Sequence, residues 1–459
     1  MTEERFATLG VREVWGGVLP FGLSAADRRR HLLIVGKTGT GKSTLLKSLL
    51  MQDIQAGASV ALIDPHGDLA KEVLSYVPRN RSKDVVYFNP ADLEHPIGLN
   101  LLTAATEDTR HVVASGVVSA FKQIWNDSWG PRLEYLLYAG ISTLLECPAA
   151  SLLALPRLLT DAAYRRGVVR LVTDPVVKAF WETEYEAYER RFRSEIIAPV
   201  QNKVGQLLMA APLRNILGQV KSTISIPFVM ERGRIFIANL SKGLLGEDKS
   251  SLLGSLLVTQ FQLAALSRDG IPEAKRRDCF LYVDEFQNVA TDAFCSILSE
   301  ARKYRLNLTL SHQFTTQLRE QVREAVFGNV GSIVAFRTGA EDAEALSREF
   351  GAAYPAHAFT ELSNYEIFVK LLANGETREP FQGRTLPAQA APNTARRLDL
   401  IRLSQERFGT KRELIEDKIR RWLTHRGGKR NPSFVQPVQQ AKPVSRREAK
   451  HVPVGASSR

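Results

Sequence analysis

The eight residues Gly36-Lys37-Thr38-Gly39-Thr40-Gly41-Lys42-Ser43 decide the fold of this chain. They fit the pattern G-x-x-x-x-G-K-[ST], which is typical of a loop that binds the phosphates of a nucleotide. An apolar run at residues 31–35 precedes the loop, and leucines at helical spacing follow it over residues 43–55. A strand, the loop and a helix are therefore expected in this order, which is the context that such a loop requires.

The chemistry of this loop predicts ATP and Mg²⁺ as cofactors. Backbone N–H groups of the loop and the N-terminus of the following helix attract the β-phosphate. Lys42 is expected to reach the β- and γ-phosphate oxygens, and Ser43 is expected to ligate Mg²⁺. We therefore predict that residues 36–43, together with Thr44, bind the nucleotide, and that Lys42 also takes part in catalysis.

A second apolar run ends in two carboxylates. Residues 280–283 predict a buried strand, which Asp284 and Glu285 follow directly. Beside a phosphate-binding loop, Asp284 is expected to hold Mg²⁺ through its water ligands. Glu285 is expected to polarise the attacking water as a general base. Without such a loop in the chain, the same pattern would indicate only a strand end that meets solvent.

Polar residues also follow the apolar run at residues 306–310. In a parallel sheet, the Gln313 amide would lie beside Glu285, where it can respond to the loss of the γ-phosphate. The alternative is a polar strand end without a role. His312 is expected to pack or to form a loop hydrogen bond, because phosphoryl transfer does not require an imidazole.

Asp64 and His66 follow the strand predicted at residues 60–63. Pro65 and Gly67 alone would make an ordinary turn at this place. A role of Asp64 or His66 near the nucleotide, or at a subunit interface, is the alternative interpretation.

The rest of the chain predicts an α/β fold with a mainly parallel sheet. Further short β-branched or apolar runs recur, and helical patterns separate several of them. They lie at residues 85–88, 235–240 and 332–336, and a possible edge strand lies at 366–373. From residue 101 to about 219, helical periodicity replaces the strand signals. We expect a sheet domain over 1–100 and 220–390 and an all-helical insertion over 101–219.

Positive charge is concentrated near the C-terminus. The chain of 459 residues has a net charge of +12, and residues 391–459 carry 17 lysine and arginine residues against 6 acidic ones. Residues 1–390 are close to neutral, with 44 basic and 43 acidic residues. Residues 391–459 are therefore expected to form a basic helix and a disordered tail, from 427 onward, that tether DNA. The alternative is a solvated tail that is basic for solubility alone.

The composition excludes several classes of protein. Apolar residues make up 44% and charged residues 24% of the chain, so wholesale disorder is excluded. No apolar run approaches the ~20 residues that cross a bilayer, and the N-terminus lacks the layout of a signal peptide. The three cysteines include no CxxC pair. We expect a cytoplasmic protein, whose recruitment to the inner membrane would depend on partners.

The motifs together resemble those of type IV coupling proteins and related conjugative or secretion ATPases of the FtsK/HerA superfamily. The resemblance covers roughly residues 18–390. It is carried by RRRHLLIVGKTGTGKST, ALIDPHGDLA, NDSWGPRLEYLL, LYVDEFQNVATDAFCSILSEARKYRLNLTLSHQ and VAFRTGAEDAEAL. It implies a RecA-like motor domain with an all-helical insertion, six subunits in a ring, and ATP hydrolysis at subunit boundaries that moves DNA through the centre. Relaxase or secretion-channel proteins are the partners it implies.

The resemblance also assigns roles to single residues. Arg302, which lies ahead of the strand that leads to Gln313, would reach the γ-phosphate of a neighbouring subunit. Arg132 and Arg337 are weaker candidates for this arginine. Gln313 would be the sensor of the third motif.

Two functions remain open on the sequence. The first is a ring-forming ATPase that binds and translocates DNA in conjugative transfer or type IV secretion. The second is a nucleotide-gated switch that docks protein substrates to a secretion machine and hydrolyses ATP slowly. A small-molecule kinase fits less well, because Glu285 and a strand-end sensor suit the activation of water.

Overall fold

The computed structural model of this chain describes residues 6–102, 107–291, 293–314, 318–351, 353–387 and 392–424. The chain divides into two units, Met1–Arg426 and Gly427–Arg459. The second unit, for which the sequence predicts disorder, lies outside the described residues. The first unit contains the phosphate-binding loop and all the predicted strands.

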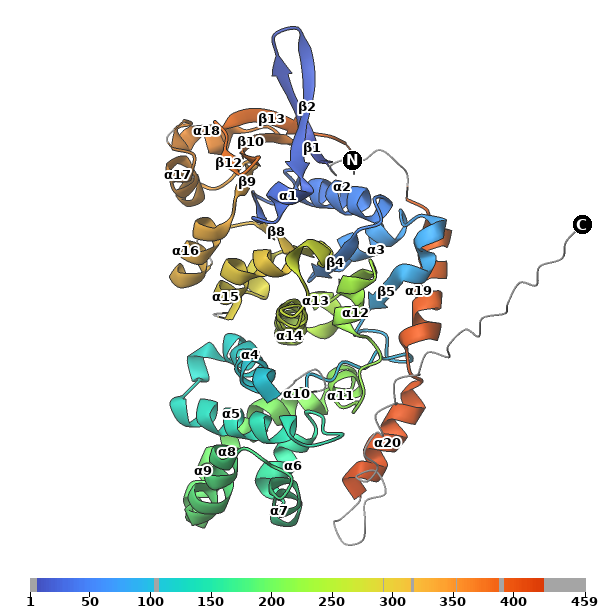
Figure 1. Cartoon of the computed structure of the whole chain (residues 1–459), viewed down its shortest axis with the longest axis vertical. Coiled ribbons are helices and arrows are strands. Elements are labelled where there is room, and N and C mark those ends of the chain that lie inside the picture. Colours follow the sequence, from blue (N-terminus) through green and yellow to red (C-terminus); the bar gives the residue numbers. More distant parts are fainter. Residues whose placement is uncertain are drawn as a thin grey trace, which may run out of the picture. The chain divides into compact units, whose positions relative to one another are not determined.

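An 11-stranded sheet forms the centre of the first unit (Figure 1). Seven neighbouring strands pair in parallel. In spatial order they are β9 (Ser332–Ala335), β3 (Leu32–Val35), β8 (Leu306–His312), β7 (Cys279–Val283), β4 (Ser59–Asp64), β6 (Ile235–Asn239) and β5 (Val85–Phe88). Each corresponds to a run that the sequence indicates, so the predicted α/β fold with a mainly parallel sheet is confirmed.

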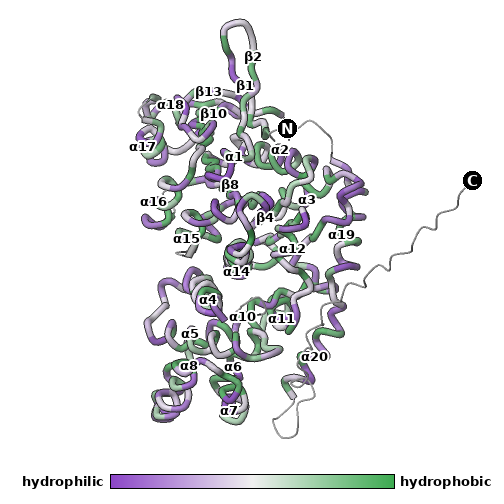
Figure 2. Tube along the Cα trace, in the orientation of Figure 1, coloured by the Kyte–Doolittle hydropathy of each residue, from purple (hydrophilic) through white to green (hydrophobic). Residues whose placement is uncertain are grey.

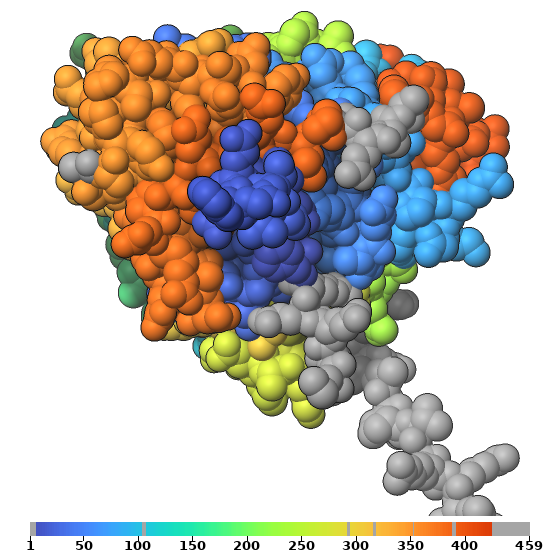
Figure 3. All heavy atoms as spheres, turned by 90° about the horizontal axis from the view of Figure 1, so that it is seen from above, coloured from blue at the N-terminus to red at the C-terminus, as the bar shows by residue number. Residues whose placement is uncertain are grey.

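Four antiparallel strands extend the sheet beyond β9. They are β10 (Glu366–Lys370), β13 (Phe381–Thr385), β1 (Phe6–Val14) and β2 (Gly17–Ser24), in this spatial order. The position of β10 agrees with the predicted edge strand, although β2 forms the actual edge. In Figure 3 the N-terminal residues, in dark blue, lie against orange residues from the later part of the chain. The sequence motifs gave no indication of the β1–β2 hairpin.

Helices cover both faces of the sheet. One face carries α2 (Lys42–Gln55) and α3 (Asp68–Leu74), and the other carries α14 (Glu247–Leu266). Successive strand residues such as Leu33 and Ile34 belong to two different apolar clusters, because neighbouring side chains of a strand point to opposite faces. Figure 2 shows green hydrophobic and purple hydrophilic residues alternating along the outer helices, as one-sided burial requires.

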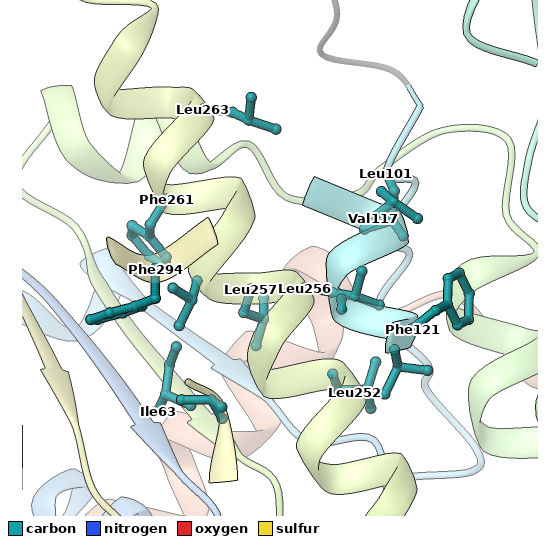
Figure 4. Packing of buried hydrophobic residues seen from close by; sticks show 14 of the residues in the cluster. Ile63, Leu101, Val117, Phe121, Leu252, Leu256, Leu257, Phe261, Leu263 and Phe294 are labelled. Atoms are coloured by element: carbon teal, nitrogen blue, oxygen red, sulfur yellow. The ribbon is translucent and has the colours of Figure 1, made fainter. Parts of the chain in front are cut away.

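The long helix α14 is buried on most of its sides. Its side chains Leu252, Leu256 and Phe261 are buried between the sheet and the helical insertion (Figure 4). A helix that is apolar all round is stable only when other elements surround it. Gly116 of the insertion allows this close packing, since a Cβ there would lie 2.5 Å from Cγ2 of Thr259.

The chain between β5 and β6 is helical in its described part, as predicted. Its α-helices are α4 (Arg110–Ile124), α5 (Pro131–Leu145), α6 (Ala154–Thr160), α7 (Ala162–Val169), α8 (Pro175–Ala179), α9 (Arg190–Val200), α10 (Gln206–Met209), α11 (Ala211–Leu217) and α12 (Ile226–Glu231). The division into separate sheet and insertion domains stays a prediction. Among the described residues, no helix combines the length and apolarity needed to cross a membrane.

Two C-terminal helices change one expectation. The sequence indicated that the compact part of the chain ends near residue 390, but the compact unit extends to Arg426. In α19 (Thr394–Phe408), Leu400 is buried against the sheet, and Ser404 Oγ accepts a hydrogen bond from Tyr87 N of β5 at 2.8 Å. The following helix, α20 (Arg412–Thr424), contacts α11 of the insertion. These packed helices therefore belong to the folded body and not to the tail.

Candidate nucleotide-binding site

The phosphate-binding loop lies between β3 and α2, where the sequence predicts it. Gly39 and Gly41 have φ angles of 78° and 122°, a region that residues with a side chain rarely adopt. A Cβ at Gly41 would also lie 2.9 Å from Cδ1 of Tyr365 and 3.0 Å from Cε1 of Phe336. Gly41, a glycine of the pattern, is thus required by both backbone conformation and space, whereas Gly39 is favoured by its backbone conformation alone.

Backbone hydrogen bonds fix the start of the loop to the two strands that flank β3. Gly36 N donates to the carbonyl oxygen of His312 at 3.2 Å, and Lys37 N donates to that of Arg337 at 2.8 Å. His312 ends β8, and Arg337 follows β9. The loop is therefore held from both sides by strands that are distant in the sequence.

Lys42 points into the loop. Its Nζ donates to the carbonyl oxygens of Gly36 at 2.5 Å and of Lys37 at 3.0 Å. Burial lowers the pKa of Lys42, while the nearby Glu285 and Asp284 carboxylates oppose this shift. A buried cation held by two backbone oxygens of the loop is placed to neutralise an anion that enters it.

Asp284 and Glu285 follow β7 and are both buried at the same edge of the sheet as the loop. Burial, with the carboxylates of Asp64 and Glu285 nearby, raises the pKa of Asp284 to about 6. A cation near this group would relieve the repulsion between the carboxylates. Ser43 lies exposed in the first turn of α2, and Thr44 next to it is half-buried. The hydroxyl and carboxylate oxygens of Ser43 and Asp284 are hard ligands of the kind that Mg²⁺ prefers.

A network of amides joins Glu285 to the loop. Gln313 Nε2 donates to Glu285 Oε1, and Thr38 Oγ1 donates to Gln313 Oε1 at 2.9 Å. Gln287 Nε2 donates to Glu285 Oε2 at 2.7 Å. Glu285 itself has a left-handed backbone with φ of 45°, a strained state for a residue with a side chain. The predicted proximity of Gln313 and Glu285 is therefore found, and Thr38 joins them.

Asp64 lies at the same edge, at the end of β4. It accepts hydrogen bonds from His66 N at 2.9 Å and from Ala70 N at 2.8 Å, which fix the start of α3. Burial raises the pKa of Asp64, and its charge acts on Asp284. The His66 side chain is exposed. Asp64 thus stabilises the turn that the sequence favoured, and it also lies at the acidic end of the site, the position that the alternative interpretation requires.

His312 is fully buried behind the loop. Burial and the charge of Lys42 lower the pKa of His312 to about 3, so its imidazole is neutral at physiological pH. Its two ring nitrogens have no hydrogen-bond partner among the described residues. The expected packing role agrees with this burial, and its backbone oxygen supplies the loop hydrogen bond.

The three candidate arginines occupy different regions. Arg302 is exposed and lies before β8, so the seven residues of this strand separate it from Gln313 by about 20 Å. Arg337 lies beside the loop, where its guanidinium donates to Leu362 O at 3.3 Å and to Asn364 Oδ1 at 3.1 Å. Arg132 lies in the insertion, over the ring of Phe192. Within one chain, only Arg337 is near the site.

Two residues at the site were not predicted. Gln287 follows Glu285 by two positions, and a polar residue so close to the predicted base was the available signal. Tyr365 contacts the loop from the turn before β10. It is more than 300 residues from the loop in the sequence, and the predicted edge strand after it gave no indication of this contact.

The fold and the site define a P-loop nucleotide-binding protein. Residues 16–260 match the family described as the central domain of the helicase HerA, and residues 278–365 match the family described as the TraM recognition site of TraD and TraG. The chain belongs to the family of the HerA central domain. The resemblance to type IV coupling proteins of the FtsK/HerA superfamily, expected from the motifs, is confirmed.

Solved structures share the fold. The plasmid coupling protein TrwB in complex with ADP and Mg²⁺ has a TM-score of 0.59 at 18% identity, over 84% of this chain and 91% of that chain. VirB4 of Thermoanaerobacter pseudethanolicus has a TM-score of 0.56 at 15% identity, over 83% of this chain and 96% of that chain. The likeness at this identity concerns the fold alone. No curated protein sequence matches the chain.

Proposed function

We propose that this protein is a ring-forming ATPase that couples ATP hydrolysis to DNA binding and translocation in conjugative transfer or type IV secretion. The observation that carries the proposal is the network from Thr38 through Gln313 to Glu285. It connects the phosphate-binding loop to a buried carboxylate at the adjacent strand ends. An acid beside the loop can activate water for hydrolysis, and an amide beside it can respond to the loss of the γ-phosphate.

Each residue then has one role. Lys42 and the N–H groups of residues 36–44 neutralise the phosphates, and Ser43 and Asp284 hold Mg²⁺. The metal ion, when bound, supplies charge stabilisation for the transferred phosphoryl group. Glu285 accepts the proton of the attacking water. Gln313, which contacts both Glu285 and Thr38, transmits the loss of the γ-phosphate to β8. TrwB, which shares this fold, is described in complex with ADP and Mg²⁺, with an ATP analogue and with a GTP analogue, which supports a nucleoside triphosphate with Mg²⁺ as the ligand.

The position of Arg302 supports assembly into a ring, for which we propose a homo-hexamer. This exposed arginine lies at the amino end of β8, about 20 Å from the site of its own chain. It can therefore complete a nucleotide site only in a neighbouring subunit. Six copies around one channel need only a few basic residues each to line it, so a nearly neutral body is compatible with DNA in the centre.

The nucleotide-gated recruitment switch is the second candidate. It is favoured by the match of residues 278–365 to the TraM recognition site of TraD and TraG, which points to partner binding. This range includes Glu285 and Gln313, so partner docking and nucleotide state would be linked in one segment. Relaxase or secretion-channel proteins are the partners proposed for either function.

The test is ATP turnover of the full chain without DNA, with single-stranded DNA and with duplex DNA, run beside size measurement with and without ATP. The motor predicts turnover that DNA stimulates and a ring-sized species. The Glu285→Gln variant serves as the inactive control. Turnover that no form of DNA changes, in a protein that stays monomeric with ATP, would contradict the motor and favour the switch.

A further inference from the structure

Tyr365 is held against the phosphate-binding loop in an unusual conformation. It lies in the turn before β10 with a φ of 69°, which residues with bulky side chains rarely adopt. Two backbone hydrogen bonds maintain it: Tyr365 N donates to Thr40 O of the loop at 2.8 Å, and Thr385 N of β13 donates to Tyr365 O at 2.9 Å. A strained backbone that the surroundings enforce is typical of ligand-binding positions.

The ring of Tyr365 lies directly on the loop. A Cβ at Gly41 would be 2.9 Å from Cδ1 and 3.3 Å from Cε1 of this ring. Phe336 fills the space behind the loop and is fully buried, whereas Tyr365 remains 44% exposed. One aromatic side chain thus serves as packing, while the other presents an open surface at the start of α2.

Arg337 supports the turn that carries Tyr365. Its guanidinium donates to Leu362 O and Asn364 Oδ1, and it forms no ion pair with any carboxylate in the part of the chain that the structure describes. Its backbone oxygen accepts the hydrogen bond from Lys37 N of the loop. The same residue therefore links the turn and the loop, which fixes the ring relative to the phosphate site.

The order of the strands gives the direction of a bound nucleotide. The groups for the γ-phosphate, Gln313 and Glu285, follow β8 and β7 on one side of β3. Tyr365 precedes β10, on the other side of β3 beyond β9. A triphosphate whose terminal phosphate faces β8 and β7 would direct its nucleoside toward β9 and β10. The exposed ring therefore lies at the nucleoside end of the site.

We propose that Tyr365 is the nucleoside-binding residue of this site, with its ring packed against the base of a bound nucleoside triphosphate. This inference rests on the proposed function, since it requires a triphosphate in the loop. Aromatic rings stack on any base through its π-face, so the contact adds affinity for a nucleoside without choosing strongly among bases.

Two variants distinguish the contribution of the Tyr365 ring to binding from that of its backbone conformation. Tyr365→Asn removes the ring but tolerates the left-handed φ, and Tyr365→Phe retains the ring without the hydroxyl. Trp15→Asn is the matched control, because Trp15 is a fully exposed aromatic residue in the β1–β2 turn. Binding of Mg·ATP and of Mg·tripolyphosphate, which has no nucleoside, is measured by calorimetry for each full-length variant. Thermal unfolding without ligand verifies the fold.

The expected result is that Tyr365→Asn weakens ATP binding about tenfold or more and leaves tripolyphosphate binding unchanged, while Tyr365→Phe and Trp15→Asn bind ATP like the wild type. Equal ATP affinity of Tyr365→Asn and wild type would overturn the inference. So would an equal loss of both ligands, which would mean that the residue only shapes the loop. A wild-type protein that binds neither ligand would instead overturn the proposed function.

Discussion

The two ends of β8 present different chemistry. At its carboxyl end, Gln313 is enclosed between Glu285 and Thr38, and all three residues belong to one chain. At its amino end, Arg302 is exposed and takes part in no ion pair among the described residues. A long cationic side chain without a partner contributes little to the fold. This difference supports the proposal that one end forms part of a site within the chain, whereas the other end completes a site in a second subunit.

Replacement of Arg302 tests the amino end of β8 and is expected to have the largest effect. If Arg302 completes the nucleotide site of a neighbouring subunit, Arg302→Ala should lower ATP turnover by about 10³- to 10⁵-fold, the range that such arginines contribute elsewhere. Nucleotide binding and thermal stability should change little. Lys303→Ala is the matched control, because Lys303 is the adjacent exposed cation and should turn over ATP normally. Equal activity of both variants would remove Arg302 from the mechanism.

Replacement of Glu285 tests the carboxyl end. Glu285→Gln should retain ATP binding but lower turnover by about 10²- to 10⁴-fold, because the general base is lost while the hydrogen bonds can remain. Lys42→Ala should instead weaken binding itself, since it removes the charge inside the loop. The two variants are compared by calorimetry and by phosphate release. Wild-type turnover of Glu285→Gln would show that the base assignment is wrong.

The parallel half of the sheet and this carboxyl edge could be predicted from the sequence. The reason is geometric: the carboxyl ends of parallel strands share one edge, so Asp284, Glu285 and Gln313 had to lie near the loop. The pairing of β1 with β13 and the contact of Tyr365 with the loop could not be predicted, because each joins residues more than 300 positions apart. α19 was missed for another reason. Pro387 and Pro392 favour an end of regular structure, but a new helix begins after the Asn393 cap.

A buried histidine lies near each end of β8, so the pH dependence of the free energy of unfolding tests both ends. Burial lowers the pKa of His312 to about 3 and that of His31, near the amino end, to about 4. The unfolded chain binds a proton at each below about pH 6.5, and the folded chain does not, so the free energy of unfolding falls as pH decreases from 6.5. The loss is up to about 1.4 kcal/mol per pH unit for each histidine.

His312→Gln should therefore lose less stability than the wild type between pH 6.5 and pH 4, as measured by urea unfolding at each pH. Because the pKa of Asp284 is raised to about 6 in the folded chain, its protonation increases the free energy of unfolding as pH decreases. Both proteins share this effect. His31→Gln should also cost stability at pH 7, because His31 Nδ1 accepts from Leu308 N and Nε2 contacts Leu298 O. Identical pH profiles of wild type and His312→Gln would contradict the buried neutral imidazole.

Removal of the basic C-terminal residues is expected to have the smallest effect on the nucleotide site. Residues 425–459 contain 8 lysine and arginine residues and 1 acidic residue. A chain that ends at Thr424 retains the packed α19 and α20, so DNA-free ATP turnover should be unchanged. Its DNA affinity should depend less steeply on salt, by a log–log slope of about 0.9 per lost contact on duplex DNA or about 0.7 on single strands. An unchanged slope would mean that these residues do not tether DNA.

The central claim is that Arg302, at the amino end of β8 in one subunit, completes the nucleotide site at the carboxyl end of β8 in the next subunit. It is tested most directly by mixing Arg302→Ala and Glu285→Gln subunits, each inactive alone, and by measuring ATP turnover together with the size of the assembly. The account predicts that mixed rings regain part of the wild-type activity, because some boundaries combine an intact arginine with an intact base. Mixed rings that form and remain inactive would contradict it and would direct attention to Arg337 beside the loop or to Arg132 in the insertion.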